Sequence, residues 1–181
     1  MVRWLPLAAA LALAALPLGI AHAQESALPC DARDAPGDGL QTGGLGLTRP
    51  EMDDRFGPGE AAQSGWMYAL DGATLEWAQC DLIVLFPEAW QSGREPGADV
   101  ALVESLLPAD AVLTATWPHV GVIASDPQIV ALYASSSLAE RYALLGEVLS
   151  GNVLVVYTYA NQGYEPGPIL RAELRPGVPA P

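Results

Sequence analysis

The clearest pattern of apolar and polar positions marks the start and the end of a short helix. Thr48 and Glu51 form a capping box, in which each side chain serves a backbone amide of the first turn. Gly57 and Pro58 follow the last apolar residue of the pattern and are typical of a helix end. The sequence therefore predicts a helix of about two turns over residues 49–56.

Two further helices are predicted from signals of the same kind. Asp99 precedes apolar residues that recur at helical spacing as far as Pro108. A second capping box, formed by Ser137 and Glu140, precedes a segment that runs to about Leu145. Both helices are expected to be short.

Alternation of apolar and polar residues predicts strands between these helices. The Asp71–Gly72 pair predicts a hairpin turn between the first two strands. Residues 128–134 follow a good helix start, but their β-branched and aromatic residues favour a strand. The expected strands cover residues 66–70, 74–86, 112–117, 120–124, 128–134, 153–159 and 169–174.

The order of these elements predicts the fold class. Most consecutive strands follow one another without a long helical crossover, which favours hairpins and antiparallel pairing. We expect an α+β fold, with a mostly antiparallel sheet and two or three short helices on one face. A single domain over residues 47–175 is expected after an irregular, exposed lead-in over 24–46. Residues 176–181 are expected to be a frayed tail.

The first 23 residues have the pattern of a secretory signal peptide. Arg3 supplies a positive charge, an Ala- and Leu-rich stretch follows, and Ala21-His22-Ala23 fits the cleavage pattern. A membrane anchor would need about 20 apolar residues without such a cleavage site. The mature chain is therefore predicted to begin at Gln24, to be secreted or periplasmic, and to contain no membrane span.

Two cysteines, Cys30 and Cys80, follow the predicted cleavage site. An even number of cysteines in an oxidising compartment favours a disulfide bond between them. A lipid anchor on Cys30 is the alternative, but Ala27-Leu28-Pro29 before it is a poor acylation signal. The sequence thus predicts a Cys30–Cys80 disulfide.

Charge limits the classes of partner. The 181 residues include 21 acidic and 8 basic residues, and the formal net charge is −13. Every basic residue is Arg. Nucleic acid and anionic membranes require a clustered cationic surface, which this sequence lacks. Cationic proteins, Ca²⁺ and neutral ligands remain possible partners.

The sequence contains few candidate catalytic residues. His119 is the one histidine after the predicted signal peptide, and the chain has no Lys for a Schiff base and no Gly-x-Ser-x-Gly motif. One histidine and two paired cysteines are too few for a zinc site. Asp53 and Asp54 suit the positive end of the first helix better than a metal ion. We therefore expect no cofactor and no metal.

Aromatic residues are the candidates for binding. Those at strand spacing are first expected to pack in the core, and they are Trp66, Tyr68, Trp77, Trp117, Tyr157 and Tyr159. Trp90 and Tyr164 fall in predicted loops, and they are the sequence-based candidates for exposed contact with a ligand.

Residues 46–86 resemble an envelope superfamily that includes the small outer-membrane-assembly lipoproteins and β-lactamase-inhibitor-protein-like modules. There, a Gly-Met/Leu-Thr/Ser-x-x-Glu-Val helix ends in Leu/Phe-Gly-x-Pro, and strands that carry aromatic residues follow. Here the matching segments are Gly46-Leu47-Thr48-Arg49-Pro50-Glu51-Met52, Arg55-Phe56-Gly57-Pro58 and Trp66-Met67-Tyr68. The resemblance implies protein–protein interaction in the envelope and no catalysis.

The first functional hypothesis is a secreted, non-enzymatic module that binds another protein or a peptide. Its sheet edge, or the loops near Trp90 and Tyr164, would make the contact. A small carboxylate-dependent extracellular hydrolase is the alternative, because Glu and Asp are plentiful and such an enzyme needs only two carboxylates. A Ca²⁺-stabilised solute binder is a third possibility.

Overall fold

The structure is a computed structural model, and it describes residues 40–78, 81–87, 96–119, 127–145, 150–162 and 165–177. Its helices are α1 (Arg49–Phe56), α2 (Pro96–Glu104) and α3 (Ser136–Leu144). Its strands are β1 (Glu60–Ala61), β2 (Trp66–Leu70), β3 (Ala73–Ala78), β4 (Asp81–Leu85), β5 (Val112–His119), β6 (Gln128–Ala134), β7 (Asn152–Gln162) and β8 (Glu165–Pro176).

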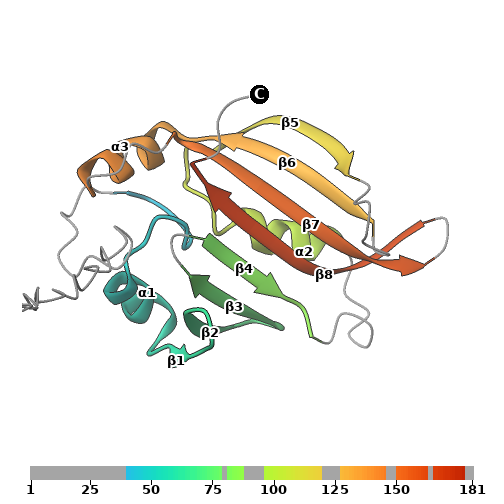
Figure 1. Ribbon diagram of the computed structural model, residues 1–181, viewed down its shortest axis with the longest axis horizontal. Coiled ribbons are helices and arrows are strands. Elements are labelled where there is room, and N and C mark those ends of the chain that lie inside the picture. The colour runs from blue at the N-terminus through green and yellow to red at the C-terminus, as the bar shows by residue number, and fades with distance from the viewer. Residues whose placement is uncertain are drawn as a thin grey trace, which may run out of the picture.

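These strands form one antiparallel sheet in the order β1-β2-β3-β4-β8-β7-β6-β5 (Figure 1). The C-terminal strand β8 lies in the middle of the sheet and joins β4 to β7. The predicted α+β class, with an antiparallel sheet and short helices, is confirmed. No helix of the described segments is long and apolar enough to cross a membrane.

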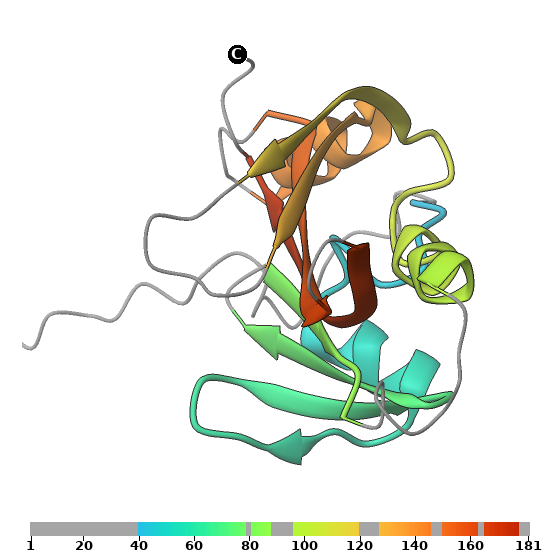
Figure 2. The same cartoon turned by 90° about the vertical axis from the view of Figure 1, so that its right-hand side faces the viewer.

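The hydrophobic core lies on one face of the sheet. Alternate residues of β3, β4 and β7 are buried, as a period of two requires. Helix α2 packs against β8, and Figure 2 shows it beside the sheet. All three helices add side chains to the same cluster, including Met52 from α1, Val103 from α2, and Leu138 and Tyr142 from α3.

Helix α1 has the predicted bounds because its signals are local. The backbone amide of Thr48 donates a hydrogen bond of 2.7 Å to Glu51 Oε2, as expected for a capping box. Gly57 ends the helix at a positive φ of 83°, which favours glycine. The predicted Asp71–Gly72 hairpin between β2 and β3 is confirmed by the pairing of Leu70 with Ala73.

The predicted strand over 74–86 is wrong, because this segment forms two strands. β3 and β4 pair antiparallel, with Trp77 opposite Leu82. The apolar run that begins at Leu82 follows the alternation of β3 closely, so the pattern alone gave no sign of a chain reversal. The predicted strand over 120–124 lies outside the described residues.

The end of the predicted lead-in is buried rather than exposed. Leu45 is fully buried, and its amide donates to the carbonyl of Leu106 at 2.9 Å. Gly43 lies so close to α2 that an added Cβ would be 1.6 Å from the carbonyl oxygen of Ser105. The glycines that suggested an irregular loop therefore allow close packing. Residues 24–39 lie outside the described part of the chain.

Two helix starts differ from prediction. Helix α2 begins at Pro96, and Asp99 is buried within it rather than capping it. Ser135, rather than Ser137, caps α3 and accepts a hydrogen bond of 3.1 Å from the amide of Leu138. Asp110, from a distant loop, accepts hydrogen bonds from the hydroxyls of Ser135 and Ser137 and from the amide of Ser137.

A register shift determines which residues of β8 face the core. Ile169 is fully buried, whereas Leu170 is half-buried. The cause is an irregularity in the pairing, in which Thr158 is opposite Arg171 but Tyr159 is opposite Ile169. β7 and β8 also extend beyond the predicted strands over 153–159 and 169–174, and β8 reaches Pro176, the first residue of the predicted tail.

Candidate binding edge at strand β5

The two edges of the sheet differ in length and in charge. β1 contains two residues, of which Glu60 is charged, so it offers little to another strand. β5 contains eight residues, none of them Asp, Glu, Lys or Arg. Within the described residues, no strand pairs with the outer side of β5. β5 is therefore the long, uncharged edge of the sheet.

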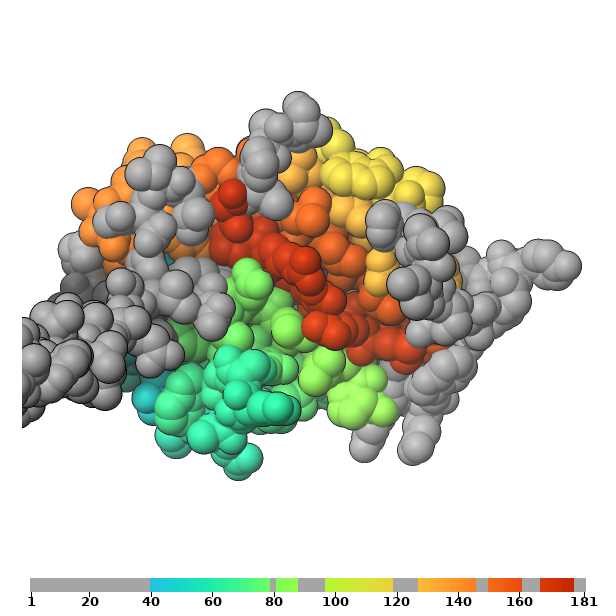
Figure 3. All heavy atoms as spheres, viewed as in Figure 1, coloured from blue at the N-terminus to red at the C-terminus, as the bar shows by residue number. Residues whose placement is uncertain are grey.

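Large apolar side chains are exposed along this edge. Val112 is 64% exposed, Leu113 is 50% exposed and Trp117 is 38% exposed. Ile129 on the neighbouring strand β6 is also exposed. Figure 3 shows β5 in yellow at the upper margin of the molecule. Edge strands are commonly protected by charged side chains, and β5 lacks this protection.

Two local features limit the pairing that β5 can accept. Leu113 is opposite Tyr133 and Ala115 is opposite Leu132, so Thr114 is an extra residue in a β-bulge. Pro118 lacks an amide proton, and prolines in sheets place their nitrogen on the unpaired side of an edge strand. A partner strand would therefore have to follow the bend at the bulge, and it would receive no hydrogen bond from the nitrogen of Pro118.

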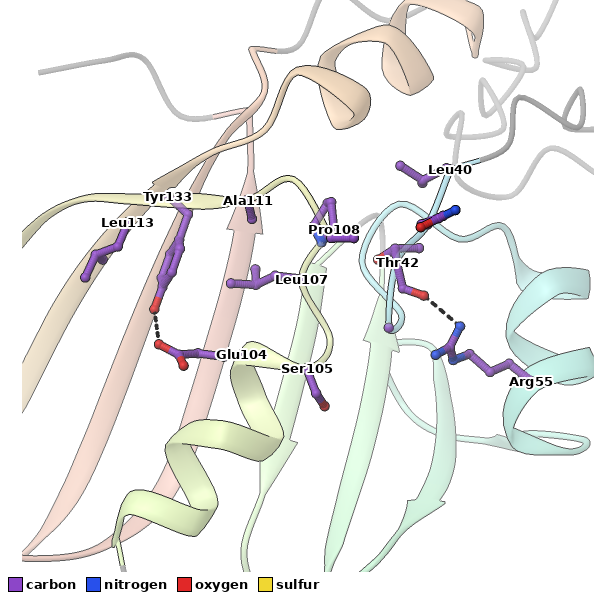
Figure 4. Close-up of a pocket in the computed structure, with 13 residues that line it drawn as sticks. Leu40, Thr42, Arg55, Glu104, Ser105, Leu107, Pro108, Ala111, Leu113 and Tyr133 are labelled. Carbon is purple, nitrogen blue, oxygen red and sulfur yellow. Dashed lines mark hydrogen bonds between the residues drawn. The ribbon is translucent and has the colours of Figure 1, made fainter.

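A pocket of about 840 Å³ lies beside the start of β5. We call it the α2–β5 pocket. Its lining comes from the segment before α1, from α1, from the end of α2, from the loop that follows and from β5 and β6 (Figure 4). The lining residues are Leu40, Gln41, Thr42, Gly43, Arg55, Glu104, Ser105, Leu107, Pro108, Ala109, Ala111, Leu113 and Tyr133.

Opposite charges lie at the two ends of this pocket. Glu104 accepts a hydrogen bond of 2.6 Å from the hydroxyl of Tyr133. Arg55 donates a hydrogen bond of 2.6 Å to the carbonyl oxygen of Thr42. Figure 4 shows the Glu104 pair next to Leu113 and the Arg55 pair at the other end. The end nearest to β5 is therefore acidic.

Burial and the hydrogen bond to Glu104 raise the pKa of Tyr133 to about 12. Burial and the neighbouring Tyr133 also raise the pKa of Tyr157 above its usual range. Both hydroxyls therefore stay protonated near neutral pH, and Tyr133 acts as a donor to Glu104. Glu104 is exposed, and a carboxylate has about four acceptor positions, so one donor leaves it able to bind a cation.

The opposite face of the sheet carries a smaller pocket of about 380 Å³. Its floor includes Val130, which is buried but lies outside the main core cluster. Trp117 forms one wall, and Glu173 with its ion-pair partner Arg175 forms another. Trp117 therefore separates this pocket from the outer edge of β5.

The aromatic residues that were expected in the core differ in their exposure. Tyr68, Trp77, Tyr157 and Tyr159 are buried in the core cluster, as predicted. Trp117, in contrast, is exposed because it lies on the edge strand.

The residues predicted for binding and for the disulfide are Trp90, Tyr164, Cys30 and Cys80, and all four lie outside the described residues. His119 is the last residue of β5. Asp53 accepts hydrogen bonds from the Gly59 amide and the Tyr68 hydroxyl, which gives it a structural role.

Sequence reasoning missed the Glu104–Tyr133 pair. Glu104 is the last residue of α2, and a carboxylate is unfavourable at the negative end of a helix. The unfavourable position of Glu104 in its helix could have indicated a contact outside the helix.

In the described part of the chain, no three His, Cys, Asp or Glu side chains gather where they could hold a metal. No family model, curated protein or solved structure matches this chain at a significant level.

Proposed function

We propose that this chain is a secreted, non-enzymatic binding module that holds an extended segment of another protein along β5. The observation that carries the proposal is the eight-residue, uncharged edge strand with exposed apolar side chains. In this mode of recognition, backbone hydrogen bonds to a sheet edge supply affinity, and side-chain contacts supply specificity.

The arrangement of the core supports the proposal. We infer that the three helices share the face on which the core cluster lies, so that the sheet is supported from that side. The edge strand is held by seven paired positions with β6, from Val112–Ala134 to His119–Gln128. A rigid edge loses little conformational entropy when a partner segment is added to it.

The bulge and the proline also fit a selective site. An unprotected flat edge tends to pair with other copies of the same chain. The bulge at Thr114 and the missing amide proton at Pro118 restrict such pairing. The resemblance of residues 46–86 to envelope interaction modules agrees with this function, and it remains a prediction.

A variant at Thr116 can test the proposal. Pro118 indicates that amides two positions apart, including that of Thr116, point to the unpaired side of β5. Thr116→Pro removes this outward donor, and Thr116→Val is a matched control that keeps it. Wild-type protein and both variants would be used in a crosslinking pull-down, and the dissociation constant of the captured protein would then be measured for each.

We expect Thr116→Pro to weaken the captured partner's affinity at least tenfold, and Thr116→Val to change it little. Hydrogen exchange of β5 amides should slow when the partner is bound. Equal affinity of the wild type and Thr116→Pro, with both folded by circular dichroism, would refute the use of this edge. A captured segment crosslinked far from β5 would refute it as well.

A further inference from the structure

We propose that the acidic end of the α2–β5 pocket is a socket for a basic side chain, Arg or Lys, of the segment added to β5. This inference rests on the proposed function and names the chemistry of the partner at that site.

The geometry places the socket within reach of an added strand. Leu113 and Tyr133 are paired residues, so their side chains point to the same face of the sheet. Both line the α2–β5 pocket, together with Glu104. A residue opposite Leu113 on an added strand would point to this face, about 4.8 Å beyond β5. A long side chain from that position can lie over Leu113 and reach the carboxylate.

The chemistry of the pocket favours a cation there. Glu104 has an exposed carboxylate, and an apolar side chain placed over it would remove its water without replacing the lost hydrogen bonds. An Arg or Lys head group can replace them with charge-assisted hydrogen bonds. Its aliphatic stem can pack on Leu113, whose side chain is half exposed.

The surrounding charge has the same sign. In the described residues 96–119 and 127–134, the charged residues are Asp99, Glu104 and Asp110, and there is no Arg or Lys. These segments include α2, β5 and β6. Arg55 lies at the far end of the pocket, where its guanidinium donates to the carbonyl of Thr42. A basic residue of the partner segment is therefore favoured at the end of the edge nearest to Glu104.

The test uses synthetic eight-residue peptides that alternate Thr and Val and carry one variable residue at each position in turn. The variable residue is Arg, Lys, norleucine, Gln or Glu, and dissociation constants are measured by fluorescence anisotropy. At one position, we expect peptides with Arg or Lys to bind at least tenfold more tightly than peptides with norleucine or Gln. Peptides with Glu should bind most weakly.

Two protein variants locate the effect. Glu104→Gln should abolish the preference for Arg and Lys while leaving the binding of the norleucine peptide within about twofold. Glu140→Gln is the matched control, because it removes one exposed negative charge from α3, outside the pocket lining. It should keep the preference.

The outcomes separate this inference from the proposed function. If peptides bind and Thr116→Pro weakens them, but Arg and norleucine are equivalent or Glu104→Gln has no effect, the socket is refuted and the edge stands. If no peptide binds the wild type more tightly than Thr116→Pro, both proposals are refuted. A β5-dependent dimer of this chain in sedimentation experiments, with no peptide binding, would refute both as well.

Discussion

Arg141 offers the sharpest test of how the fold is held together. Its side chain is 1% exposed and forms an ion pair with Glu51, which is 36% exposed. Its Nε also donates to the carbonyl oxygen of Gly46 at 3.2 Å. These contacts connect α3 with α1 and with the segment before α1. Arg141→Met removes the charge and both hydrogen bonds while keeping a long apolar side chain.

The magnitude follows from these contacts. A hydrogen bond that involves a charged group contributes about 1.5–3 kcal/mol. Glu51 is partly hydrated and its carboxylate still accepts from Thr48, so removal of Arg141 does not leave it unsatisfied. We therefore expect Arg141→Met to lower the free energy of unfolding by about 2–3 kcal/mol.

Substitution of the ion-pair partner, Glu51, should lower the free energy of unfolding at least as much. Glu51→Gln can keep the capping box, but it removes the negative charge that the buried guanidinium of Arg141 contacts. Breaking a buried pair in this way costs about 3–5 kcal/mol, and partial exposure of Glu51 places the expected value near the lower end. The double variant should lose about 2 kcal/mol less than the sum of the single variants, because the two residues contact each other directly.

Urea unfolding monitored by circular dichroism would give the free energy of unfolding of the wild type, the two single variants and the double variant. With a typical dependence of about 1–3 kcal/mol per molar urea, the midpoint of Arg141→Met should fall by about 0.7–3 M. A loss under about 0.5 kcal/mol, or strictly additive effects in the double variant, would refute the reasoning. Either result would mean that the pair does not form in solution.

Three further predictions concern a loop, a glycine contact and the edge strand. Burial opposes ionisation of Asp110, but hydrogen bonds from Ser135, which caps α3, and from Ser136 and Ser137 outweigh it and hold its pKa below the usual range. Asp110→Asn should lower the free energy of unfolding by about 1 kcal/mol, discounted for exposure. Urea titrations at pH 7, 5 and 3 should show this difference shrinking below about pH 4, where the unfolded carboxyl takes up a proton. Gly43→Ala should cost about 3 kcal/mol or more because its Cβ would meet the Ser105 carbonyl. At Gly97, no atom of the described residues lies within 4 Å of an added Cβ, so Gly97→Ala should be neutral or slightly stabilising in thermal melts. Trp117→Ala should leave the melting temperature nearly unchanged while weakening partner binding, and a large drop in melting temperature would show that this side chain is part of the core.

Local signals in the sequence predicted the elements that depend on local contacts. Helix α1 matched its predicted bounds because Thr48, Glu51 and Gly57 act on their own backbone neighbours. The cap of α3 was placed two residues late because serines occupy both positions. Asp110, which lies far away in the chain, binds the hydroxyls of both serines, so the serine pattern alone did not show which one is the cap.

The candidate site depended on strand order, which the sequence pattern does not contain. The residue pattern over 112–117 is the same as that of a strand inside a sheet, so Trp117 was expected in the core. Its exposure follows from the position of β5 at the end of the sheet. The pairing of Glu104 with Tyr133 likewise requires α2 and β6 to meet, and only the unfavourable place of Glu104 in its helix hinted at it.

The central position of β8 also governs when the chain can fold. β1–β4 meet the rest of the sheet through the pairing of β4 with β8, in which Leu82 lies opposite Leu174. The sheet therefore cannot close until residues 165–176 have been synthesised. Such long-range pairing slows folding. Until β8 is in place, β4 and β7 each have an unpaired edge within the described sheet, and both edges are open to pairing with other strands.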